Sequence, residues 1–226
     1  MDRSGSMGAI SKDVIGGYNK FIADQKALKV GTCDVSFYQF DTEYDVVYEN
    51  TPIDFVKDLD DKTFVPRGGT ALLDAVGRTV ENVGKQLSNL NENERPDRVL
   101  VVILTDGEEN SSRIYNAERV KQLVEQQQNV YKWEFTYIGA NQNAWNTGTN
   151  MGIRYANNLT YAANSVGTAD AFASLSTSTA NYRSAVSASY CLNFSDIEKQ
   201  VKAGAAIDLN AVKAAFNNSQ AQTTNP

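Results

Sequence analysis

Histidine is absent from the 226 residues of this chain. Its absence excludes His-ligated zinc sites, Ser-His-Asp and Cys-His catalysis, and proton shuttles that titrate near pH 7. The chain has only two cysteines, Cys33 and Cys191, which lie far apart and form no CxxC pattern. They indicate neither a disulfide scaffold nor a thiolate zinc site, and two free thiols fit a reducing compartment.

Long hydrophobic runs and an excess of basic residues are also missing. No signal-peptide pattern opens the chain, and no apolar stretch is long enough to span a membrane. The 21 Lys and Arg residues are outnumbered by 27 Asp and Glu residues, which gives a net charge of −6. This balance argues against binding to nucleic acid or to a membrane and is compatible with a cation ligand. We therefore expect a cytoplasmic protein, and the sequence leaves its oligomeric state open.

Helical and strand periodicities alternate along most of the chain. Apolar spacing predicts helices over residues 8–28, 71–90, 116–127, 144–151 and 168–186. Apolar runs and alternation predict strands over 33–37, 44–48, 98–105, 131–137 and 159–162. The segment 98–105 is almost wholly apolar, which is typical of a strand buried on both faces of a parallel sheet. The pattern predicts an α/β fold with a doubly wound, mostly parallel central sheet flanked by helices.

Composition changes toward the C-terminus, where Ala, Ser, Thr and Asn become frequent. We predict an α/β domain over 1–187, a helical appendage over 188–218 and a disordered tail over 219–226. In the first helix, Gly16 and Gly17 each weaken the helix by about 1 kcal/mol relative to alanine. We expect close packing against a sheet to explain them.

Three oxygen-rich clusters stand beside a helix start or a strand end. They are DRSGS at 2–6, RGGT at 67–70 and TDG at 105–107. Loops at the carboxyl ends of strands and the helix starts that face them share one edge of an open α/β sheet, so we expect the clusters to meet there. Two carboxylates and three hydroxyls at that edge favour Mg²⁺ or Mn²⁺ over zinc or copper.

Each cluster also has a simpler interpretation. Ser4 or Ser6 can serve as a helix N-cap, as can Thr70, and Asp106 can shape a turn before Gly107. Taken singly, none of these residues points to a metal site, and it is their combination and order that favours one.

The segments DRSGSM (2–7), PRGGTALLDA (66–75) and LTDGEEN (104–110) resemble the metal-ion-dependent adhesion site of the von Willebrand factor A (vWA) family, also called integrin I-like. The resemblance covers roughly residues 2–186 and implies a Rossmann-like sheet that carries a divalent cation. It also implies a protein partner whose Asp or Glu carboxylate completes the coordination of Mg²⁺, or of Mn²⁺. The residues that would bind the metal directly or through water are Asp2, Ser4, Ser6, Thr70 and Asp106.

Three charged residues adjoin these ligands in the sequence. We expect Arg67, Glu108 and Glu109 to tune the choice of partner at the rim of the site. The runs GGYNKF and TALLDA are more similar to the intracellular bacterial and phage-encoded branch of the family than to animal adhesion proteins. A phage-encoded protein would be virion-associated rather than purely cytoplasmic.

In this family a hydrophobic strand in the middle of the sheet precedes the metal-binding Asp, whereas only Met1 precedes Asp2 here. We expect that this first central strand is missing from the chain through truncation or misassigned initiation. The alternative is that another segment or molecule supplies it by donor-strand pairing.

Three functions compete. The first is a metal-dependent protein-binding module without catalytic residues. The second is a structural or assembly protein of a phage particle or bacterial complex, which uses the fold without an obligatory metal. The third is a Mg²⁺-dependent phosphohydrolase with Asp2 or Asp106 as nucleophile, against which stand the missing phosphate loop and the missing histidine base.

Overall fold

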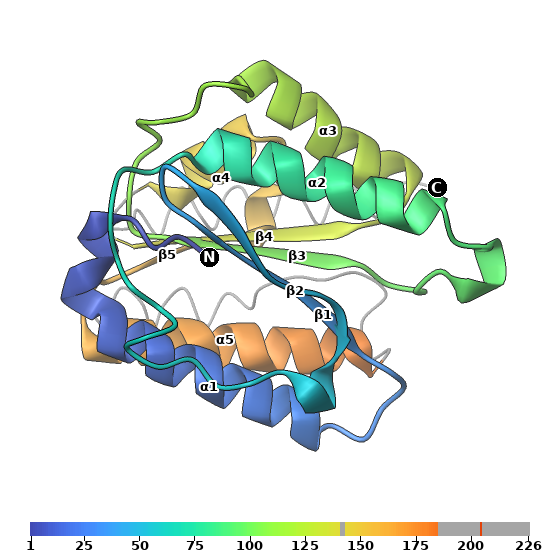
Figure 1. Ribbon diagram of the computed structural model, residues 1–226, viewed down its shortest axis with the longest axis horizontal. Coiled ribbons are helices and arrows are strands. Elements are labelled where there is room, and N and C mark those ends of the chain that lie inside the picture. The colour runs from blue at the N-terminus through green and yellow to red at the C-terminus, as the bar shows by residue number, and fades with distance from the viewer. Residues whose placement is uncertain (141–142, 185–203, 205–226) are drawn as a thin grey trace.

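A computed structural model describes residues 1–140, 143–184 and Gly204 (Figure 1). The proposed appendage over 188–218 and tail over 219–226 lie outside these residues, apart from Gly204. The α-helices are α1 (Ser11–Ala27), α2 (Leu72–Ser88), α3 (Ala117–Val130), α4 (Ala144–Asn150) and α5 (Ser165–Arg183). The short 3₁₀ helices are η1 (Gly5–Ile10), η2 (Ile53–Phe55), η3 (Glu92–Glu94) and η4 (Tyr155–Asn157). The strands are β1 (Asp34–Phe40), β2 (Tyr44–Pro52), β3 (Leu100–Thr105), β4 (Glu134–Ala140) and β5 (Asn158–Tyr161).

The strands form two sheets. Strands β3, β4 and β5 are parallel and lie in that order, and β1 pairs with β2 in antiparallel orientation. Met1–Arg3 lies between the ends of β1 and β3 and joins the two sheets. The amide of Asp2 donates to the carbonyl oxygen of Leu104 at 2.8 Å, and the amide of Arg3 donates to that of Phe40 at 2.8 Å. The first residues of the chain therefore lie in line with both sheets, at their carboxyl-end edge.

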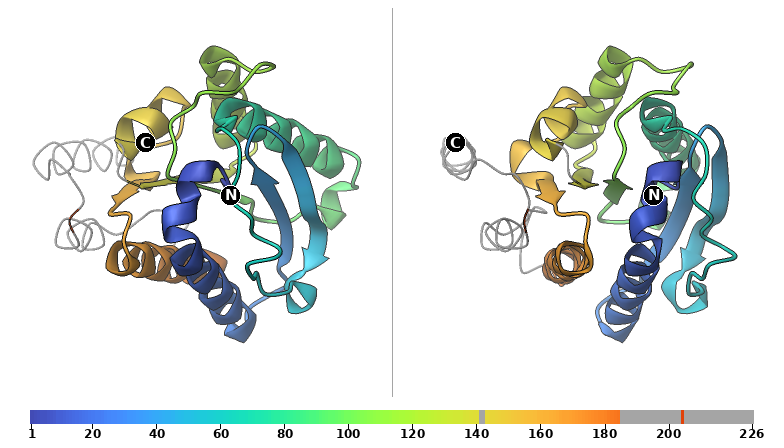
Figure 2. Two further views of the ribbon diagram at one scale, coloured as in Figure 1. Left: turned by 60° about the vertical axis from the view of Figure 1, so that its left-hand side comes forward. Right: turned by 90° about the vertical axis from the view of Figure 1, so that its left-hand side faces the viewer.

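Helices cover both faces of the parallel sheet, as the predicted α/β fold requires. Helices α2, α3 and α4 lie on one face and α1 and α5 on the other (Figure 2). One core gathers side chains of α1, α5 and the sheet face above them, including Val14, Ile138 and Leu175. A second core forms under α2 and α3, where Val80 and Val124 are fully buried. No helix among the described residues is long and apolar enough to cross a membrane.

Two expectations about local packing need correction. A Cβ atom on Gly17 would overlap the ring of Phe172 in α5, so this glycine allows two helices to approach, not a helix and a sheet. Nothing lies within 4 Å of a Cβ on Gly16, so packing does not explain that glycine at all.

Strand β4 is buried along its whole length. The alternation in segment 131–137 is typical of a half-buried strand, but every residue of β4 is buried and the strand starts at Glu134. Glu134 is accommodated because both of its carboxylate oxygens accept hydrogen bonds from Arg154, at 2.8 and 2.7 Å. The hydroxyl of Thr136 likewise donates to the carbonyl oxygen of Asn157 at 2.8 Å.

Candidate functional site

The carboxylate of Asp2 is buried between the ends of β1 and β3. Its Oδ1 accepts a hydrogen bond from the amide of Ser4 at 2.6 Å. Its Oδ2 accepts one from the hydroxyl of Thr105, the last residue of β3, also at 2.6 Å. Both oxygens are therefore held in fixed directions by residues of two of the predicted clusters.

Residues of the three clusters converge. Oγ of Ser4 lies 3.0 Å from Oγ of Ser6, which donates to Oδ1 of Asp106 at 2.6 Å. A Cβ atom placed on Gly107 would lie 2.6 Å from Oγ1 of Thr70 and 3.4 Å from Oγ of both Ser4 and Ser6. Three hydroxyl oxygens thus face one small space beside Gly107, which has no side chain to fill it.

The simpler interpretations of these residues do not account for their side chains. Ser4 occupies the N-cap position of η1, but its side chain makes no capping hydrogen bond. The N-cap of α2 is Ala71 rather than Thr70. The turn after β3 is fixed by Thr105, whose Oγ1 accepts a hydrogen bond from the amide of Gly107 at 3.1 Å. The hydroxyls of Ser4 and Thr70 are therefore not used as helix caps.

The loop after β3 caps the start of α2 instead. Asn110 accepts a hydrogen bond from the amide of Thr70 at 2.9 Å, and Glu109 accepts one from the amide of Leu73, also at 2.9 Å. Asp74 in the first turn of α2 also binds this loop, because its carboxylate accepts hydrogen bonds from the amides of residues 113, 114 and 115. These bonds hold the loop that carries Asp106 against the loop that carries Thr70.

The three predicted rim residues differ in their surroundings. Glu108 is exposed to solvent. Arg67 is half-exposed but already paired, with Asp41 at 3.0 Å and with Glu43 at 2.7 Å. Glu109 is half-buried, and besides its bond to α2 it accepts hydrogen bonds from Ser111 and Ser112. Of these three residues, Arg67 and Glu109 have their charges paired or hydrogen-bonded within the described part of the chain, and no such bond is found for Glu108.

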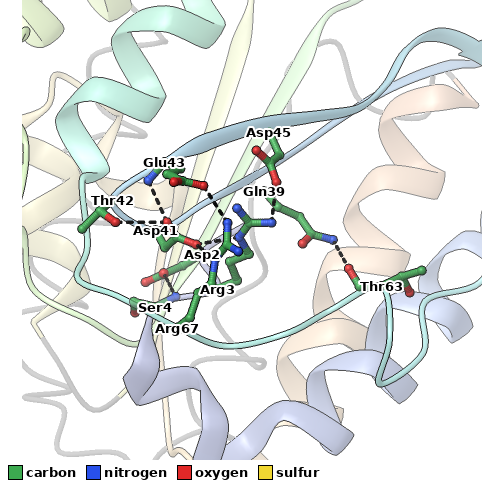
Figure 3. Close-up of polar contacts among 10 residues, drawn as sticks. All are labelled: Asp2, Arg3, Ser4, Gln39, Asp41, Thr42, Glu43, Asp45, Thr63 and Arg67. Atoms are coloured by element: carbon green, nitrogen blue, oxygen red, sulfur yellow. Dashed lines mark hydrogen bonds and ion pairs between the residues drawn. The ribbon is translucent and has the colours of Figure 1, made fainter.

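An ion-pair network that sequence reasoning missed lies beside Asp2 (Figure 3). Its centre is Asp41, which is buried just after the end of β1. Oδ2 of Asp41 is 2.8 Å from Nε of Arg3 and 3.0 Å from Nε of Arg67. Arg3 also reaches Asp45 at 2.7 Å. No sequence signal marks Asp41 beyond its place between the predicted strands 33–37 and 44–48, whereas Thr105 belongs to the TDG cluster at 105–107.

Burial dominates the electrostatics of the two candidate carboxylates. It raises the pKa of Asp2 above its ordinary value of 3.8, although hydrogen bonds from Thr105 and Ser4 partly oppose the change. The pKa of Asp106 is raised as well, first by burial and then by the charge of Asp2. Neither residue pairs with a Lys or Arg side chain of the described chain. Two neighbouring carboxylates without a Lys or Arg partner favour an added cation.

The donor set determines which cation would fit. Within residues 1–140 and 143–184, no three His, Cys, Asp or Glu side chains gather in a way that could hold a metal ion. The candidate site therefore depends on hydroxyl oxygens as much as on carboxylates. Such a set of hard oxygen donors with only two formal charges suits Mg²⁺ or Mn²⁺ with water completing the shell.

The architecture matches solved structures at low sequence identity. A von Willebrand factor type A structure from Catenulispora acidiphila covers 80% of this chain with a TM-score of 0.50 and 15% identity. The fold is vWA-like. Two structures of proximal thread matrix protein 1 from the mussel byssus cover 82% of this chain, with TM-scores of 0.53 and 0.51 and identities of 17% and 18%.

This vWA-like chain spans less than half of each matched structure, namely 41% to 45% of their chains. No protein-family model matches the sequence, and no curated protein matches it either. At these identities the likeness establishes the fold and leaves the function to be argued from the residues of the site.

Proposed function

We propose that this protein is a metal-dependent protein-binding module, in which Asp2, Ser4, Ser6, Thr70 and Asp106 hold Mg²⁺ or Mn²⁺ at the top of the vWA-like sheet. When bound, the ion would supply an electrophilic position for a carboxylate of the partner. The observation that carries the proposal is the convergence of the Ser4, Ser6 and Thr70 hydroxyls beside Gly107. It is supported by the two neighbouring carboxylates, whose pKa values are raised by burial.

The burial and chemistry of these five residues suit them to this role. Ser4 and Thr70 are buried, whereas Ser6 is exposed, so the cluster opens to solvent on one side. A partner can approach from that side without displacing the protein backbone. Neutral hydroxyl donors leave an ion with net positive charge, which strengthens its attraction for an incoming Asp or Glu side chain. Glu108 and Arg67 adjoin the candidate ligands in the sequence and are exposed, and we expect repulsion or pairing there to select among partners.

Calorimetric titration with MgCl₂ and MnCl₂ tests the metal site directly. We expect the protein to bind both ions and Asp106→Ala to lose binding while keeping its far-ultraviolet circular dichroism. The exposed Glu108→Gln variant is the matched control and should bind the ions as the wild type does. Absence of binding in the wild type would refute the metal site.

The partner is then sought by affinity capture from the native host with Mg²⁺ and with EDTA. Proteins that depend on the site should be retained in Mg²⁺ and lost both with EDTA and with the Asp106→Ala bait. Retention that is indifferent to chelation and to the substitution would refute the metal-dependent mode of binding.

A structural or assembly role without an obligatory metal is the second candidate. It is favoured by the similarity in fold to a protein named as a matrix protein of the mussel byssal thread. In this case assembly into particles or filaments, followed by sedimentation, should persist in EDTA and in Asp106→Ala. We propose no catalytic role, and a screen with generic phosphomonoesters and Mg²⁺ tests the phosphohydrolase alternative.

A further inference from the structure

Three segments of the chain meet at the side chain of Asp41, which is 1% exposed. The segment 2–6 contributes Arg3, which stands between the candidate ligands Asp2 and Ser4. The segment 67–70 contributes Arg67, three residues before Thr70. Both Nε atoms approach the same carboxylate oxygen, Oδ2, at 2.8 and 3.0 Å.

Backbone contacts bring the same segments together. The amide of Arg67 donates to the carbonyl oxygen of Arg3 at 2.7 Å, and the amide of Gly5 donates to that of Gly68 at 3.1 Å. The carbonyl oxygen of Asp41 itself accepts a hydrogen bond from the amide of Ala71 at 3.0 Å. Asp41 is thus bonded by its side chain to both loops and by its backbone to the start of α2.

The charge of Asp41 is needed to hold this arrangement. Two guanidinium groups converge on it, and without a carboxylate between them they would repel each other. Arg3 is only 9% exposed, and its Nη2 has no hydrogen-bond partner among the described residues. The other oxygen of Asp41, Oδ1, accepts a hydrogen bond from the amide of Glu43 at 2.7 Å and is not free to compensate.

We propose that Asp41 is a positioning residue, which sets the separation of the 2–6 and 67–70 loops and thereby the affinity of the candidate site for a divalent cation. The inference rests on the function proposed above, because it concerns the same ligands. Asp41 need not touch the ion, since it acts on Asp2 and Ser4 through Arg3 and on Thr70 through Arg67. Residues that orient metal ligands in this way typically change affinity by about 10- to 100-fold when removed.

The test is titration of Mn²⁺, with the free ion followed by electron paramagnetic resonance. We expect Asp41→Asn to raise the Kd for Mn²⁺ by about tenfold or more. Asp60→Asn is the matched control, because it makes the same change of charge and loses bonds to Thr63 in a separate loop. Its Kd should stay within about twofold of the wild type, since it contacts no ligand.

A double-mutant cycle separates positioning from general damage. If Arg67 acts through Asp41, Arg67→Met should raise the Kd alone but add little to Asp41→Asn, whereas independent structural damage would be additive. A folded Asp41→Asn protein with wild-type Kd, or additive effects in the cycle, would overturn the proposal. If Asp41→Asn does not fold, Arg67→Met is used in its place, because Arg67 is half-exposed. An unchanged Kd for Mn²⁺ in Arg67→Met would then also overturn the proposal. Loss of Mn²⁺ binding in Asp106→Ala but not in Asp41→Asn would leave the proposed function standing alone.

Discussion

The substitution Gly107→Ala tests the candidate site at the point where its hydroxyls meet. The added methyl would lie 2.6 Å from Oγ1 of Thr70 and 3.4 Å from the hydroxyl oxygens of Ser4 and Ser6. To reach ordinary van der Waals contact, Thr70 must move away by about 0.8 Å or more. Metal sites tolerate deviations of only about 0.2 Å in their ligand distances. We therefore expect Gly107→Ala to weaken Mn²⁺ binding by more than about tenfold.

The cost to folding should be smaller than the cost to binding. Overpacking of this kind destabilises a protein by about 1–3 kcal/mol, and here one side of the cluster is open and can relax. Mn²⁺ titration and urea unfolding of the metal-free protein measure the two effects separately. The matched control is Gly16→Ala, whose added methyl meets nothing within 4 Å and should stabilise α1 by about 0.4–1 kcal/mol. A Gly107→Ala protein that binds Mn²⁺ as tightly as the wild type would refute the placement of the ion beside Gly107.

The remaining predictions concern the framework of the site. Gly17→Ala should destabilise the protein by about 1–3 kcal/mol in urea unfolding, because its methyl overlaps the ring of Phe172; an unchanged midpoint would contradict the close approach of α1 and α5. Glu109→Gln should cost about 1–3 kcal/mol, because the carboxylate accepts charge-assisted bonds from the first turn of α2 and from its own loop; if Glu109 serves only partner contact, unfolding will not change. Burial alone would raise the pKa of Asp41 and of Asp74, but hydrogen bonds from backbone amides, and for Asp41 from arginines, lower both below 3.8. The contribution of these carboxylates to the free energy of unfolding should therefore be present above pH 3.8 and be lost as the pH falls through their lowered pKa values. In acid unfolding curves, Asp74→Asn should lose less stability over this pH range than the wild type.

The order of elements could be predicted from the sequence because local periodicity reports which face of each segment is buried. The apolar spacing of segment 71–90 predicts a helix, and α2 extends over Leu72–Ser88. The strand and helix alternation likewise gave the correct fold class. These elements bury apolar side chains at the spacing of their own secondary structure, so no distant partner is needed to recognise them.

The burial of β4 could not be predicted in the same way. Its polar residues are buried because distant groups satisfy them, as Arg154 does for Glu134. A period of two in the sequence indicates a half-buried strand unless those partners are known. The pattern correctly predicts the strand, but its burial depends on tertiary contacts that the pattern does not show.

The candidate site shows the same division. Its five candidate ligand residues belong to short motifs at strand ends and helix starts, and topology alone is enough to bring such motifs to one edge of the sheet. Asp41 and Glu109, whose carboxylates accept hydrogen bonds from the segments that carry the candidate ligands, act across long sequence separations and follow no spacing rule. Glu109 stood out as a charged neighbour of the ligands, but its charge is used within the protein, at the start of α2.

The two carboxylates of the site differ in what else they hold. Asp2 lies between two sheets, is fully buried and accepts bonds from Ser4 and Thr105, so its removal would disturb the junction of β1 and β3 along with any bound ion. Asp106 is half-buried and receives one side-chain bond, from Ser6. An effect of Asp2→Ala on binding would therefore confound fold and site, because unsatisfied buried donors cost about 1–3 kcal/mol each. Asp106 places a carboxylate at the same site but makes fewer structural hydrogen bonds. Its substitution therefore tests metal binding with little effect on the fold.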